Sequence, residues 1–149
     1  MNLLFAPALA FAALPLGAAV PMKNSTDGIE RWPNAGRPGT AWSVRAEDGP
    51  LLFTGQVFAA EVSSGARPQA DQMIDALGRL LAEGGGDLRR VLRLNLYVAN
   101  DDVTTPVEAA LAARFADAPP AVTIVRSPLA RAGALVACDA VAVVPRRSR

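Results

Sequence analysis

The chain of 149 residues is long enough for one domain with a modest core, and its 51% hydrophobic and 19% charged residues are typical of a globular protein. The net charge is only +1, so no broad basic surface points to a nucleic-acid partner. Histidine is absent and cysteine occurs once, which excludes histidine-based triads, histidine-containing metal sites and an internal disulfide. We therefore expect no metal and no cofactor.

Residues 1–21 resemble a secretory signal peptide, because an uncharged apolar stretch ends in the small residues Gly17 and Ala19. They lack a basic residue, however, and Met22 is an alternative start. The first reading predicts a periplasmic or secreted protein, and the second predicts a cytoplasmic one. Breaks such as Pro15 make a stable membrane-spanning helix unfavourable, so we expect no stable membrane insertion.

Residues 23–40 are polar and interrupted by Pro and Gly, so we expect an irregular lead-in to a domain spanning 41–145. The segments AWSV at 41–44 and LLFTGQVFA at 51–59 read as strands. In the second strand, Gly55 indicates a bulge or a close approach.

The segment QADQMIDALGRLLAEGGG at 69–86 predicts the first helix and its end at three glycines. Its apolar residues recur at helical spacing: Met73, Ile74, Leu77, Leu80 and Leu81. A strand over 90–100 follows, in which leucines face one way and Arg93, Asn95 and Tyr97 face the other.

The segment TPVEAALAARF at 105–115 predicts the second helix, with Thr105 as N-cap and Glu108 completing a capping box. Two apolar segments, AVTIVRS at 121–127 and ALVACDAVAVV at 134–144, read as strands joined in a hairpin. In the second of them Cys138 reads as a small buried thiol, and the basic residues of 146–149 read as a solvated tail.

Helices that alternate with strands predict an α+β fold, with a mixed sheet and both helices on one face. The other face of that sheet is then left for something else, most simply another subunit.

Three segments resemble the reactive intermediate deaminase family, also called Rid, RidA or YjgF: LLFTGQVFA, ALGRLLAEGGGDLRRVLRLNLYVAND and PAVTIVRSPLARAGALVACDAVAVV. The resemblance runs from about Trp42 to Val144. It implies a chorismate-mutase-like subunit, assembly into homotrimers, and sites in the clefts between subunits. Active members hydrolyse enamines and imines of the 2-iminobutanoate and 2-aminoacrylate type, using an arginine that binds the substrate carboxylate and a glutamate that orients water.

The resemblance also marks where this sequence departs from the family. The arginine position is held by Val122, and by spacing the glutamate position is held by Ala137. Valine cannot hold a carboxylate and alanine cannot orient water. A family asparagine falls at Glu108, and a family tyrosine falls at Trp42 if one residue is inserted in the following turn, or at Ala41 if not. The chain is thus a divergent member by pattern, and its catalytic residues stay unassigned.

Four residues are candidates for binding: Trp42, Ser43, Arg126 and Asp139. Arg126 is a rim residue, or it reaches back toward the cleft, or it pairs with Asp139 on a neighbouring strand. Asp139 sits in an apolar strand and needs a partner, either in a structural salt bridge or as a relocated acid or base.

Three functional hypotheses follow. The first is a protein that binds a small metabolite in intersubunit clefts without the standard imine hydrolysis. The second is a hydrolase of enamine or imine C–N bonds with a rearranged site built on Arg126 and Asp139. The third is a structural or interaction role for the trimer.

Overall fold

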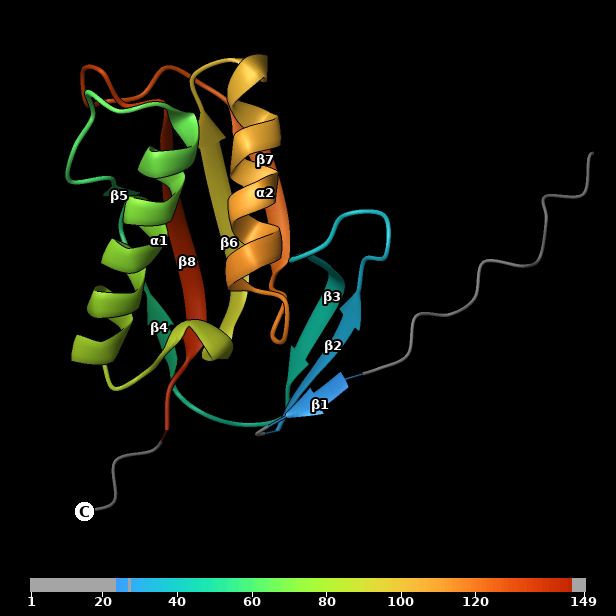
Figure 1. The fold of residues 1–149 in the computed structure, drawn as a ribbon. Coiled ribbons are helices and arrows are strands. Elements are labelled where there is room, and N and C mark those ends of the chain that lie inside the picture. The colour runs from blue at the N-terminus through green and yellow to red at the C-terminus, as the bar shows by residue number, and fades with distance from the viewer. Residues whose placement is uncertain (1–23, 27, 146–149) are drawn as a thin grey trace, which may run out of the picture.

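The computed structural model describes residues 24–26 and 28–145 and shows one mixed sheet with two helices packed on one of its faces (Figure 1). This confirms the α+β architecture expected from the sequence. The expected signal peptide at 1–21, the alternative start at Met22 and the basic tail at 146–149 lie outside the described residues. Within the described ranges, no helix is both long and apolar enough to cross a membrane.

The strands are β1 (Asn24–Thr26), β2 (Ile29–Pro33), β3 (Ala41–Ala46), β4 (Leu51–Phe53), β5 (Val57–Phe58), β6 (Val91–Val98), β7 (Ala121–Arg126) and β8 (Val136–Val143). The helices are α1 (Ala66–Glu83) and α2 (Thr104–Arg114), with short 3₁₀ turns at Leu88–Arg90 and Asp101–Val103.

The sheet order is β1-β2-β3-β7-β6-β8-β4, with β5 also pairing with β8. Strand β6 runs parallel to β7 and antiparallel to β8 and lies between them. The expected hairpin between the last two strands is therefore wrong. The reason is that an apolar strand pattern marks where a strand lies and leaves its partner open, and β6 is the partner of both.

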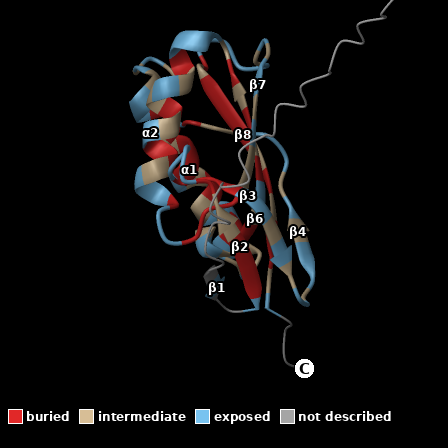
Figure 2. Cartoon of the chain, turned by 90° about the vertical axis from the view of Figure 1, so that its right-hand side faces the viewer, coloured by how far each residue is buried: buried red, intermediate tan, exposed pale blue. Residues whose placement is uncertain are grey.

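The core lies between the sheet and the helices, where Figure 2 shows the buried residues gathered. Leu94, Leu96 and Val98 of β6 are buried there, as the alternating pattern predicts. Helix α1 starts at Ala66, before the expected start, and ends at the predicted glycines. The prediction that Leu80 belongs to the buried apolar stripe is wrong, because Leu80 remains 39% exposed.

The predicted irregular lead-in at 23–40 is also wrong over its first half, because β1 and β2 form there and pair with β3. These three strands make an extension that we call the arm. Arg31 of β2 is buried and donates hydrogen bonds to the backbone carbonyls of Arg89 and Val91, which fixes the arm to the start of β6. The polar composition of this segment gave no sign that the Arg31 side chain would be buried.

Two further local expectations need correction. The strand expected over 51–59 is interrupted after Phe53, and Gly55 lies in the irregular stretch between β4 and β5. Helix α2 begins one residue before Thr105, and its N-cap position makes no side-chain capping bond. The capping box is wrong because Glu108 turns to Arg37 instead.

Candidate functional site

A pocket of about 340 Å³ lies where the arm meets the central sheet. At this junction β3 pairs with β7 through Ala41 and Ala121, and the amide of Ala41 donates to the carbonyl of Pro120 at 2.8 Å. The pocket is lined by Asn34, Arg37, Thr40, Ala41, Trp42, Arg93, Ala121, Val122 and Thr123. Trp42 is 69% exposed and supplies an aromatic wall.

The loop between β2 and β3 forms one side of the pocket and is held in a defined shape. The backbone N–H of Asn34 donates to the Thr40 carbonyl at 2.9 Å, and the Thr40 hydroxyl donates to the Arg37 carbonyl at 2.7 Å. Gly39 has φ +77 and packs so closely on α2 that an added Cβ would lie 2.3 Å from the backbone of Leu111. The loop is thus ordered before any ligand arrives.

Arg37 projects from this loop toward α2. Its Nε and Nη2 both donate to Oε1 of Glu108, at 3.0 and 2.7 Å. The two side chains keep 42% and 38% of their surface exposed. The ion pair is therefore largely solvated, and such pairs contribute little to stability.

Arg93 also lines the pocket, and it begins a chain of hydrogen bonds on the sheet face away from the helices. Its Nε donates to Oδ1 of Asn95 at 3.1 Å. The Asn95 amide nitrogen donates to Oδ1 of Asp139 at 2.8 Å, and the Tyr97 hydroxyl donates to Oδ2 at 2.7 Å. Because the side-chain nitrogen of Asn95 donates to Asp139, the side-chain oxygen of Asn95 faces Arg93 and accepts its hydrogen bond. The carboxylate thereby orients the arginine through the amide.

The chain of hydrogen bonds perturbs the phenol within it. The pKa of Tyr97 is raised, first because the neutral hydroxyl donates to Asp139, then by partial desolvation and by the charge of Asp139. The positive charge of Arg93 acts in the opposite direction. Tyr97 therefore stays a donor at neutral pH.

The charges of the pocket all have one sign. Two guanidinium groups line it, the other polar lining residues are the neutral Asn34, Thr40 and Thr123, and no described lining residue is acidic. Guanidinium groups bind carboxylates through paired hydrogen bonds. The arrangement can therefore bind an organic anion against the Trp42 ring.

The structure brings together some of the residues singled out in the sequence. Trp42 and Val122 both line the pocket, whereas Ser43, which follows Trp42 in the chain, does not. Val122 also packs partly against the hydrophobic core. Ala137 is fully buried, between Tyr97 of β6 and Phe58 of β5.

Arg126 and Asp139 are not brought together. Arg126 is in register with Val98, on the helix side of the sheet, and its Nη1 donates to Oδ2 of Asp101 at 2.9 Å. Asp139 lies between Cys138 and Ala140, which face the core, so its side chain projects from the opposite face. The open alternative of an Arg126–Asp139 pair is wrong, since β6 separates the two strands.

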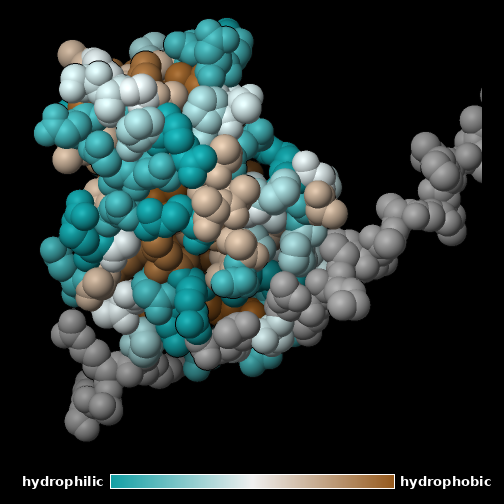
Figure 3. Space-filling view, viewed as in Figure 1, coloured by the Kyte–Doolittle hydropathy of each residue, from teal (hydrophilic) through white to brown (hydrophobic). Residues whose placement is uncertain are grey.

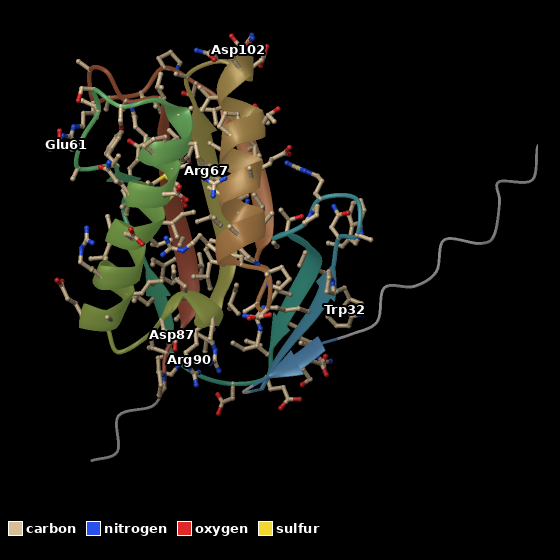
Figure 4. All side chains as sticks on the ribbon, viewed as in Figure 1. Trp32, Glu61, Arg67, Asp87, Arg90 and Asp102 are labelled. Carbon is tan, nitrogen blue, oxygen red and sulfur yellow. The ribbon has the colours of Figure 1, made fainter. Side chains whose placement is uncertain are left out.

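Arg126 is instead the rim residue, 64% exposed in its ion pair. Figure 4 labels Asp102, the neighbour of its partner, at the end of α2 and far from the arm that carries Trp32. The pocket touches β7 at its other end, over residues 121–123. A long side chain alone does not bring Arg126 to the pocket.

Sequence reasoning missed Arg37 and did not weigh Arg93. Arg37 lies in the segment expected to precede the domain, so its packing on α2 had no local signal. Arg93 and Asn95 were assigned to the outward face of β6, and the alternation RLNLY was the signal available for them. Their link to Asp139 follows only from the pairing of β6 with β8.

The single cysteine matches its expected role. Cys138 is a free, fully buried thiol in the core. Burial, and secondarily the charge of Asp139, raises its pKa to about 12. A thiol held protonated in this way is a poor nucleophile at neutral pH.

The arrangement of two helices on one face of this mixed sheet is the YjgF-type, chorismate-mutase-like fold. A YjgF-family protein from Neisseria meningitidis matches with a TM-score of 0.62 and 23% identity, covering 80% of this chain and 97% of its own. A protein of the conserved Rid family from Yersinia pestis matches with a TM-score of 0.64 and 23% identity, covering 71% and 87%.

A YjgF/YER057c/UK114-family protein from Mycobacterium tuberculosis matches with a TM-score of 0.60 and 24% identity, covering 71% of this chain and 87% of its own. No protein-family model matches the sequence, and no curated protein sequence matches it significantly. The likeness to solved structures establishes the fold.

Proposed function

We propose that the chain is a divergent Rid-type protein that forms homotrimers and binds a small carboxylate-bearing metabolite in a cleft beside Trp42, without standard imine hydrolysis. The observation that carries this proposal is the state of Arg93. Its Nε is committed to Asn95, and its two terminal nitrogens make no hydrogen bond within the described residues, in a pocket without acidic lining.

Assembly is supported by the contrast between the two faces of the molecule. The helix face is mostly hydrophilic (Figure 3). The opposite sheet face exposes large apolar side chains: Leu51 and Phe53, in register with β8, and Val125, in register with Tyr97. Covering these side chains with further copies of the chain removes apolar surface from water. Sedimentation that shows a stable monomer at micromolar concentration would contradict the trimer.

Loss of the standard chemistry is supported by the two positions that the family resemblance marks. Val122 offers its pocket no polar group, and Ala137 has no side-chain oxygen and no exposed surface. A hydrolase built on Arg126 and Asp139 together loses its support, because these residues project from opposite faces of the sheet. Asp139 remains beside Tyr97, where it accounts for the orientation of Arg93 without acting on substrate.

The binding proposal is tested by thermal shift of the purified full chain against a panel of small carboxylates and their uncharged amides. We expect carboxylates to raise the melting temperature and amides to leave it unchanged, because a ligand of the folded state stabilises it. Arg93→Met should remove the shift. Arg79→Ala, an exposed arginine of α1, is the matched control. Equal shifts for Arg93→Met and the unaltered protein would sink the proposal.

A further inference from the structure

We infer that the ligand of this pocket is a dicarboxylate, with one carboxylate on Arg93 and the other on Arg37. The inference rests on the proposed function and narrows its substrate class. It comes from the presence of two arginines, from different elements, that line one pocket of about 340 Å³.

Arg93 is arranged to bind a carboxylate end-on. Asn95 takes its Nε, which leaves Nη1 and Nη2 as a parallel pair of donors. A planar carboxylate accepts both at once, and this geometry gives charge and direction together. Asp139 fixes the amide that fixes the arginine, so the donor pair is oriented in advance.

Arg37 supplies the second positive group. Glu108 occupies Nε and Nη2 but leaves Nη1 without a hydrogen bond within the described part of the chain. The ion pair is more than a third exposed on both sides, so exchanging part of it for a ligand carboxylate costs little. The backbone of Arg37 is meanwhile held by the turn from Asn34 to Thr40, which limits the entropy lost on binding.

The remaining lining suits a short linker between the two acids. Trp42 and Val122 offer apolar surface, and Thr40 and Thr123 offer hydroxyl groups. The volume is at the lower end of the roughly 300 to 1,000 Å³ of ligand pockets, which favours a molecule of a few carbon atoms. A monocarboxylate of the same length would leave one arginine without a partner.

Calorimetric titration of the full chain with matched pairs, succinate against butyrate and glutarate against pentanoate, tests the inference. We expect one of the diacids to bind at least about tenfold more tightly than its monoacid, the gain of roughly one charged hydrogen-bonded contact. Arg37→Met should remove this preference, because the affinity for each diacid should fall to about that for its monoacid. Arg93→Met should lower the affinity for both the diacid and the monoacid of each pair.

Glu108→Gln separates a binding role for Arg37 from a structural one. Removing the competing carboxylate should raise diacid affinity several-fold, and more than it raises monoacid affinity. A purely structural ion pair predicts no such gain.

The outcomes separate the dicarboxylate inference from the proposed function. Equal affinity for diacid and monoacid, with both lost in Arg93→Met, overturns the inference and leaves the proposed function standing. No binding of any carboxylate overturns both. Tighter binding of a phosphorylated monoacid such as phosphoglycolate than of either diacid overturns the dicarboxylate class.

Discussion

Gln69 is a buried amide that joins two loops at one end of the sheet. Its side chain is fully buried in the first turn of α1. The nitrogen donates to the carbonyls of Val62 and Ser64 at 2.9 and 2.8 Å and approaches that of Gly133 at 3.3 Å. The oxygen accepts from the Leu135 amide at 2.9 Å.

Gln69→Leu keeps the size of the side chain and removes all of these bonds. A buried polar group left without a partner costs about 1 to 3 kcal/mol. Val62 and Ser64 are partly exposed, so their carbonyls can accept hydrogen bonds from water in the variant. The cost therefore comes mainly from the backbone amide of Leu135, which loses its partner, and from the lost hydrogen bonds themselves. We expect the free energy of unfolding to fall by about 2 to 4 kcal/mol, a large part of a typical 5 to 15.

Urea denaturation followed by circular dichroism, at one fixed protein concentration because assembly contributes to stability, measures this loss. Gln72→Leu is the matched control. It lies one turn along the same helix and accepts a single exposed hydrogen bond from the amide of Glu61. Its expected change is within about 0.5 kcal/mol. A loss in Gln69→Leu below about 1 kcal/mol, or equal to that of Gln72→Leu, would refute the reasoning.

Tyr97 is the single tyrosine of the chain, so tyrosinate absorbance reports its titration directly, and Asp139→Asn should lower its raised pKa; an unchanged titration would contradict the Asp139 contact. The Cys138 thiol, with its pKa raised from 9.0 to about 12, should react with a thiol reagent at least about a thousandfold more slowly than in urea. Gly39→Ala should destabilise far more than Gly85→Ala, since both have positive φ but only Gly39 packs against backbone; equal melting temperatures would count against this.

Much of the fold could be predicted because its strongest signals are local. The stripe containing Met73 and Leu77 marks α1, and the alternation of Leu94 and Leu96 marks β6. Strand partners could not be predicted in this way. The apolar run containing Cys138 fits beside β6 or β7 equally well, and only the packed sheet decides between them.

The candidate site could be predicted only in part, for a related reason. Trp42 and Val122 were found through the family resemblance, and both line the pocket. The charged residues of that pocket come from the loop after β2 and from β6, which meet only in three dimensions. Arg126 is a charged residue in an apolar strand, yet at the end of that strand it pairs with Asp101 and remains exposed to solvent.

The position of β8 has a consequence for how the chain is made. Strands β4 and β5 pair with β8 alone among the described strands, yet they leave the ribosome long before it. Until the C-terminal segment emerges, β6 offers an open edge and the apolar surfaces of α1 and α2 have no complete sheet beneath them. Contacts so distant in sequence slow folding and expose unpaired edges to other chains. The nascent protein therefore depends on β8, the last of the described strands to be made, to close the sheet, and every shortened product lacking it is a candidate for aggregation or degradation.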